Sequence, residues 1–137
     1  MHVGVAEFLE RTSKLKKKQD KINALKFNDS YVIRSVLQGV FDPRVVWLLP
    51  EGEPPYSPCT LPDQQNMFVH QCRKLQYFVS GGAPNLKQSK RELLFTELLE
   101  SIHPADAKML VSIKDKKLPW PGITEDVVRE AFPNLLP

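Results

Sequence analysis

The sequence predicts an all-α fold, a single domain of five to six helices with one long proline-rich loop. Apolar residues recur at helical spacing in several separate stretches, and these stretches begin at capping residues and end at proline or glycine. The 137 residues suit one domain, residues 1–137, whose core needs neither a metal nor a disulfide. The chain contains no internal repeat.

Residues 4–26 are predicted to form one long amphipathic helix, and the segment 1–26 is strongly basic. One face of this helix collects mainly apolar side chains, from Val5, Phe8, Leu9, Thr12, Leu15, Gln19, Ile22 and Leu25. Lysines occupy the other face. The segment carries seven lysines and arginines against three acidic residues, so its charge is the most positive of the chain.

A second helix is predicted after residues 28–30 (Asn-Asp-Ser), which offer side-chain oxygens as an N-cap. It ends before Pro43, because the residue that precedes a proline resists the helical conformation. Its apolar positions at helical spacing are Val32, Ile33, Val36, Leu37 and Val40. Residues 44–49 are too few for periodicity to decide between an extended and a short helical segment packed into the core.

Residues 50–65 are predicted to form a stiff loop without regular structure, because they contain five prolines. A loop of this length either covers the core or serves a function, and its segment 54–56 (Pro-Pro-Tyr) suits the docking of a partner. A third helix is expected from an Asp63 cap to about Val79, followed by a left-handed stop at residues 81–82 (Gly-Gly).

Residues 87–102 give the strongest helix prediction. Their wide apolar face consists of Leu93, Leu94, Phe95, Leu98, Leu99 and Ile102. Arg91, Glu97 and Glu100 are expected to point away from that face. A further helix is predicted to begin at Pro104, because the first turn does not need the N–H that proline lacks. Its buried side is expected to hold Met109, Leu110 and Ile113.

The last segment is predicted to form a rigid corner and a short final helix. Two prolines restrict the backbone on either side of Trp120, and Gly122 frees it again. Thr124 is a suitable N-cap, and the acidic residues after it favour the positive end of a helix. Pro133 stops this helix. We expect the corner to hold the preceding basic loop against the core.

The sequence contains no recognisable catalytic motif. Phosphate-binding loops, zinc-protease and serine-hydrolase signatures and paired cysteine ligands are all absent, so we expect no enzyme and no cofactor. An enzyme would require folding to bring Cys72, His70 or His103 together with acids in a pocket. Cys59, His70 and Cys72 supply at most three metal ligands, without the paired spacing of structural zinc sites.

Two cysteines are too few for a disulfide framework, and no apolar run approaches the length of a membrane span. These features predict a cytoplasmic protein. The net charge of +3 is concentrated in patches, as it is in proteins that bind nucleic acid. The alternative is that these lysines are simply solvated.

The C-terminal part of the chain resembles the helical N-terminal DNA-binding domain of phage-type ATP-dependent DNA ligases. The resemblance rests on Gly82, Lys87, Lys90-Arg91, Leu98-Leu99, Asp106, Leu110, Lys114, Lys117-Leu118, Gly122-Ile123, Val127-Val128 and Phe132-Pro133-x-Leu135. It covers roughly residues 78–137, whose ligase-like helical part is residues 85–137. Residues 31–43 (YVIRSVLQGVFDP) match more loosely. The whole chain is also similar to a family of small uncharacterised proteins from T4-like bacteriophages, which implies that it acts in the host cytoplasm during infection.

The resemblance implies a domain that grips double-stranded DNA by its sugar-phosphate backbone and seals nothing, because the K-x-D-G motif of ligases is absent. The implied DNA-binding residues lie at the start of one helix and in one basic loop, and they are Lys87, Lys90, Arg91, Lys114, Lys116 and Lys117. The lysine face of the first predicted helix could extend this footprint through Lys14, Lys17, Lys18 and Lys21.

The sequence therefore leads to two function hypotheses. The first is a non-enzymatic protein that binds duplex DNA largely without sequence specificity. The second is an interaction module that binds a host or viral replication or transcription protein. It would use the proline-rich loop and the apolar edge near Trp47 and Tyr56. A continuous positive surface favours the first hypothesis, and an exposed apolar patch favours the second.

Overall fold

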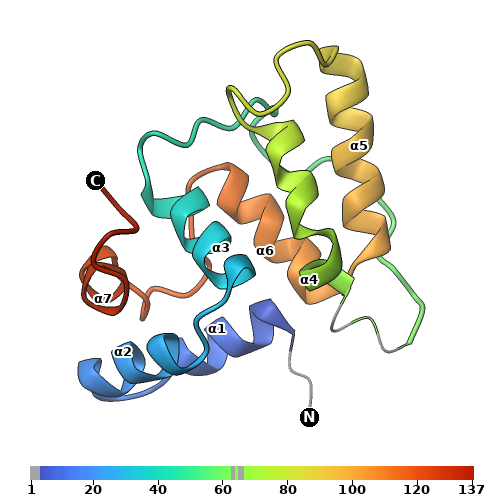
Figure 1. Cartoon of the computed structure of the whole chain (residues 1–137). Helices are drawn as coiled ribbons and strands as arrows, with labels where there is room; N and C mark the ends of the chain where they lie inside the picture. Colours follow the sequence, from blue (N-terminus) through green and yellow to red (C-terminus); the bar gives the residue numbers. More distant parts are fainter. Residues whose placement is uncertain (1–3, 63, 65–66) are drawn as a thin grey trace.

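The computed structural model describes residues 4–62, 64 and 67–137, and within these residues the protein is all-helical (Figure 1). This confirms the predicted class, with more helices than expected. The elements are α1 (Val5–Ser13), α2 (Lys18–Phe27), α3 (Tyr31–Phe41), α4 (Met67–Gln71), the 3-10 helix η1 (Cys72–Phe78), α5 (Gln88–Ser101), α6 (Pro104–Lys114) and α7 (Glu125–Ala131).

The helix α6 lies at the centre of the fold, and α1, α3 and α5 pack against it (Figure 1). It begins at Pro104 as predicted, and the His103 imidazole caps it by accepting the N–H of Ala105. Nearly all of its length is buried, through Asp106, Ala107, Met109, Leu110, Ile113 and Lys114. The core is therefore built around one helix that contacts three others.

The predicted single helix over residues 4–26 is wrong, because the chain turns between α1 and α2. Continuing α1 straight would carry α2 away from the core. The turn instead lets α1 pack on α6 while α2 packs on α7, so that Leu9 and Leu25 are both fully buried. Leu15, which belonged to the predicted apolar stripe, is left 38% exposed at the turn.

The corner after α6 holds this turn in place. A Cβ added at Gly122 would meet the backbone oxygen of Ser13 at 2.1 Å, so only glycine permits this approach. The Lys21 ammonium donates to the Gly122 carbonyl over 2.7 Å. The final helix α7 then begins at its predicted cap, since the Thr124 side chain accepts the N–H of Val127.

The predictions for α3 are confirmed. Ser30 caps the helix through its side-chain oxygen, and the helix ends at Phe41, directly before Asp42 and Pro43. The segment that follows is extended. Its Trp47 forms an isolated antiparallel bridge with Val79.

The third predicted helix is broken into the short α4 and the tighter η1, and it ends one residue earlier than expected. Val79 is already extended, because it pairs with Trp47 instead of continuing the helix. The expected Asp63 cap lies outside the described residues. Gly81 adopts the left-handed conformation with φ of 86°, in the turn after Val79 rather than at the helix end.

The helix α5 confirms the strongest prediction within one residue at each end. Its faces differ from the expectation at two positions. Arg91 is buried, with 6% of its surface exposed, whereas Leu93 is 50% exposed. The buried stripe runs through Arg91, Phe95, Leu98 and Ile102, which are spaced as successive turns of one helix face.

No helix among the described residues is long and apolar enough to cross a membrane.

We predict that Gly122→Ala lowers the free energy of unfolding by about 1–3 kcal/mol, the usual cost of overpacking. The added methyl group would displace the Ser13 carbonyl and the turn attached to it. Urea unfolding measures the effect. Ser89→Ala, at an exposed position of α5, is the control and should change stability by less than about 0.5 kcal/mol. A loss for Gly122→Ala no larger than that for Ser89→Ala would show that the corner does not hold the turn.

Candidate nucleic-acid interface

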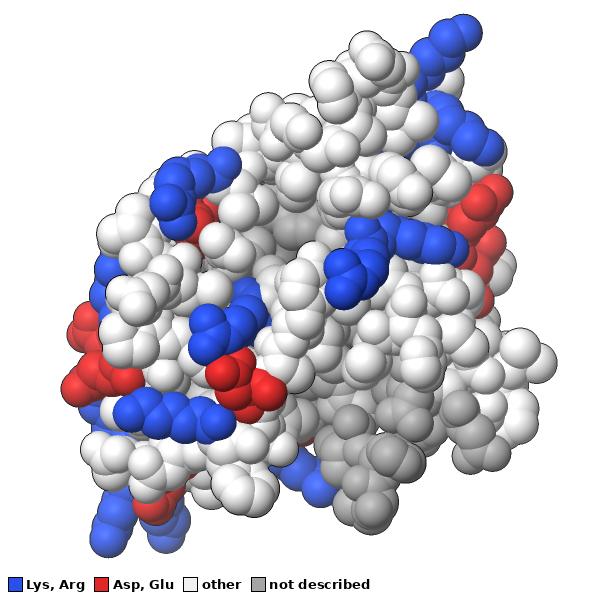
Figure 2. All heavy atoms as spheres, in the orientation of Figure 1, with Lys and Arg blue, Asp and Glu red and all other residues white. Residues whose placement is uncertain are grey.

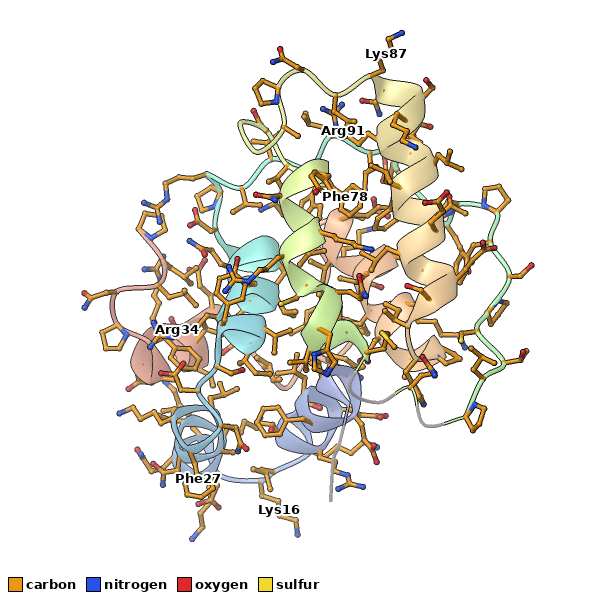
Figure 3. All side chains as sticks on the ribbon, turned by 45° about the vertical axis from the view of Figure 1, so that its right-hand side comes forward. Lys16, Phe27, Arg34, Phe78, Lys87 and Arg91 are labelled. Carbon is orange, nitrogen blue, oxygen red and sulfur yellow. The ribbon has the colours of Figure 1, made fainter. Side chains whose placement is uncertain are left out.

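Two of the predicted DNA-binding lysines stand exposed at the start of α5. Lys87 occupies the N-cap position and Lys90 lies in the first turn. No side chain caps the helix at this end, so its first amides point outward as the amides of phosphate-binding helix ends do. Figure 3 shows Lys87 projecting away from the end of α5.

Arg91, the third predicted residue of this group, is turned into the protein. Its guanidinium donates to the backbone oxygens of Tyr77 (2.9 Å) and Ala83 (3.2 Å) and to the Gln88 side chain (2.6 Å). A buried guanidinium with these acceptors is not available to a phosphate group. Arg91 instead fastens α5 to η1 and to the loop between them.

Lys114 is also buried, with 6% of its surface exposed. Its ammonium donates to the Pro50 carbonyl (3.0 Å) and pairs with Asp115 (2.8 Å). The charge of Lys114 is thus neutralised by Asp115 within the fold. The bond from its ammonium to Pro50 holds the beginning of the proline-rich loop against the end of α6.

The other two lysines of this predicted loop differ from each other. Lys116 takes the left-handed conformation, with φ of 61°, in the turn that ends α6. The N–H groups of Lys116 and Lys117 bond back to Ile113 and Ser112, which is the Schellman pattern. The Lys116 ammonium donates to the Asp42 carbonyl over 2.7 Å, and burial lowers its pKa. Lys117 is exposed.

Asp42 connects this turn to the end of α3. Its carboxylate is 1% exposed and accepts bonds from the Arg44 guanidinium, the Arg44 backbone N–H and the Gln38 amide. These bonds, chiefly that of the Arg44 side chain, lower the pKa of Asp42 to about 2. The charge of Arg44 is therefore also balanced within the protein.

The densest exposed basic group is the turn between α1 and α2. We call it the basic turn, and it comprises Lys14, Lys16, Lys17 and Lys18, all exposed. Lys14 pairs weakly with Glu10 (3.5 Å), and Lys18 pairs with Glu130 (2.6 Å). Lys16 and Lys17 have no ion-pair partner among the described residues. Lys21, the fourth accessory lysine, is held by Gly122 instead.

The positive groups are not one continuous surface. On the face formed by α3, α4 and α5, Figure 2 shows basic side chains in separate groups, with uncharged surface between them and acidic side chains beside several. Figure 3 places Lys87 and Lys16 at opposite ends of the molecule. The basic turn and the start of α5 must therefore be treated as two separate sites.

Among the exposed basic residues that sequence reasoning left out of the candidate site are Lys16, Arg73 and Lys74. Lys16 lies in the basic turn between two accessory lysines, and its position in a run of lysines was the available signal. Arg73 and Lys74 lie on η1, where the Arg73 guanidinium stacks over the Tyr31 ring at 4.9 Å. Neither carries a sequence signal, because their exposure depends on how η1 packs.

The described residues contain no group of three His, Cys, Asp or Glu side chains that could hold a metal. The Cys72 thiol is buried, donates to the Val69 carbonyl, and has a raised pKa because of its burial. His103 caps α6. That the protein is not an enzyme stays a prediction.

Comparison with models of known protein families gives a match over most of the chain. The model of a protein family described as "Family of unknown function (DUF6433)" matches residues 8–119. The chain belongs to this family. The region matched in this DUF6433 protein includes the basic turn, the start of α5 and the proline-rich loop. No curated protein and no solved structure gives a significant match.

We predict that Arg91→Ala destabilises the DUF6433 protein by about 3 kcal/mol, because several buried carbonyl oxygens lose a charged donor. Lys90→Ala, one position away on the exposed side, should change stability by less than about 0.5 kcal/mol. Chemical denaturation of both variants measures this difference. Similar values for the two variants would contradict the buried position of Arg91.

We predict that Asp42 makes stability depend on acid pH. Its folded pKa of about 2 lies below the ordinary value, so its contribution is present above about pH 4 and disappears as the pH falls through 2. The contribution is about 1–2 kcal/mol, because solvent around the exposed Arg44 weakens the pair. Unfolding of the wild type and of Asp42→Asn should differ at pH 6 and converge near pH 2. If the difference in unfolding free energy between the wild type and Asp42→Asn stayed the same from pH 6 to pH 2, the lowered pKa of Asp42 would be contradicted.

Proposed function

We propose that this protein binds double-stranded DNA through the sugar-phosphate backbone, largely without sequence specificity. The observation that carries the proposal is the basic turn. Its four exposed lysines lie within five residues, on a turn that Gly122 holds against the body of the protein. Ammonium groups clustered on an ordered backbone release counterions from DNA, and binding does not carry the entropic cost of ordering that backbone.

The start of α5 is the second contact in this proposal, through Lys87 and Lys90. It combines two exposed ammonium groups with an uncapped helix N-terminus. Arg91, Lys114 and Lys116 have no role in the proposed contact, because their charged groups are bound within the fold. Lys117 remains a candidate at the edge of the corner.

The resemblance to ligase DNA-binding domains and the similarity to phage proteins stay part of this proposal. Both are compatible with an all-helical protein that contacts phosphates through helix ends and basic turns. They imply a role in DNA replication, in nucleoid packaging or in transcription, in the cytoplasm of an infected cell. Backbone contacts carry no base code, so weak sequence selectivity follows from this mode of binding.

The second candidate function is the binding of a replication or transcription protein. Trp47 and Tyr56 themselves are partly buried against the core, and the Trp47 indole donates to the Gly39 carbonyl. The observation that favours this candidate is exposed apolar surface near this edge. Val46, next to Trp47 in the chain, is 51% exposed, and Leu93, which faces residues 49–55 of the loop, is 50% exposed.

Fluorescence anisotropy of a labelled DNA duplex tests the first proposal. We predict binding that weakens on the order of a hundredfold for a fourfold rise in salt, as for three to five neutralised phosphates. Lys16→Glu/Lys17→Glu should abolish it, and Lys87→Glu/Lys90→Glu should weaken it. The matched control is Lys26→Glu/Lys108→Glu, which changes the net charge equally outside both sites.

Equal losses in the control and in both test variants would mean that only the total charge matters, and the proposed sites would be wrong. No binding at low salt, with the protein shown to be folded by circular dichroism, would contradict the proposed function as a whole.

A further inference from the structure

A hollow of about 400 Å³ lies between the proline-rich loop and α5, at a distance from the basic turn. Figure 3 shows this loop running along one side of α5. The apolar part of the lining comes from Leu49, Pro54, Pro55, Leu93 and Phe95. Leu93 is half exposed, so part of this apolar lining is open to solvent.

The rim of the hollow is acidic. Glu51, Glu53 and Glu92 all line it, and none of them forms an ion pair within the described part of the chain. Among the described residues that line the hollow, the one basic side chain is Lys114, which is buried and already paired with Asp115. An anionic partner such as DNA would be repelled here, whereas a cationic partner would be attracted.

The loop that forms one wall is held at several points. Beyond the Lys114 bond to Pro50, the Gly52 N–H donates to Asp115 (3.1 Å) and the Ser57 N–H donates to Glu100 (2.8 Å). The Gln88 side chain from α5 donates to the Leu48 carbonyl over 2.8 Å. These bonds already order the loop in the free protein. Binding of a partner therefore does not carry the entropic cost of ordering it.

We propose that this hollow is the docking site for a cationic segment of another protein, in which a bulky apolar side chain is flanked by lysine or arginine. The apolar side chain enters between the loop and α5, against Leu93 and Phe95. The flanking cations lie over the glutamates of the rim. The site is independent of the proposed DNA contact, because it uses other residues and the opposite charge.

Titration with two fluorescent peptides tests this proposal on the whole protein. The probe carries one leucine flanked by lysines, and the comparison peptide has serine in place of the leucine. The leucine peptide should bind at least about tenfold more tightly, as expected for burying one apolar side chain. Equal binding of the two peptides would reduce the site to a general acidic surface and overturn the proposal.

Protein variants locate the site. Glu53→Lys/Glu92→Lys should weaken binding of the leucine peptide by about tenfold or more, since each reversal turns an attraction into a repulsion. Asp20→Lys/Asp126→Lys is the matched control, because it reverses two exposed acids on α2 and α7 and should change binding little. Leu93→Asn, at a position that is 50% exposed, should also weaken binding without any change in charge, and circular dichroism checks that this variant is folded.

Equal effects of the two charge reversals, or no effect of Leu93→Asn, would contradict the proposed site. Sedimentation of the protein alone tests one other occupant, the basic turn of a second copy, in which Leu15 is flanked by lysines. Self-association that is lost in both Glu53→Lys/Glu92→Lys and Lys16→Glu/Lys17→Glu would assign the hollow to that turn and overturn the proposal of a different protein.

Discussion

The burial of α6 along nearly its whole length is the constraint on which the other elements depend. On the faces that α6 turns toward α1, α3 and α5, a charged residue is costly unless it is paired or hydrogen-bonded, whereas Lys108 on the same helix is exposed. Asp106 lies in its first turn and Lys114 in its last, so each charge complements the nearby end of the helix dipole. Burial raises the pKa of Asp106, and the Ala6 N–H that it accepts opposes this effect.

These two buried charges also connect the ends of α6 to distant parts of the chain. Asp106 accepts the N–H of Ala6 over 2.8 Å and thereby anchors the beginning of α1. Lys114 holds the proline-rich loop through Pro50. The same helix therefore supports both candidate surfaces, since α1 leads into the basic turn and the loop forms one wall of the acidic hollow.

The structure divides the basic residues into those that hold the fold together and those that remain for a partner. The sequence contained a signal for part of this division. Arg91 lies four and seven residues before Phe95 and Leu98, and Lys114 lies four and seven residues after Leu110 and Ala107. Helical spacing therefore aligns both residues with buried neighbours, although Arg91 was expected to point away from the apolar face and both residues were expected to contact phosphate. Lys116 carried no such signal, because its bond to Asp42 joins segments 74 residues apart.

The sequence by itself determined the helical class, the caps at Ser30 and Thr124, the start of α6 at Pro104 and the irregular proline-rich loop. These features depend on backbone preferences and hydrogen bonds between residues close in the chain. Only the tertiary structure decided the break between α1 and α2, which follows from packing against α6 and α7 and from the approach of Gly122 to Ser13. It also decided which lysines reach solvent, because an ammonium group is exposed or buried according to distant carbonyls and carboxylates that local sequence does not reveal.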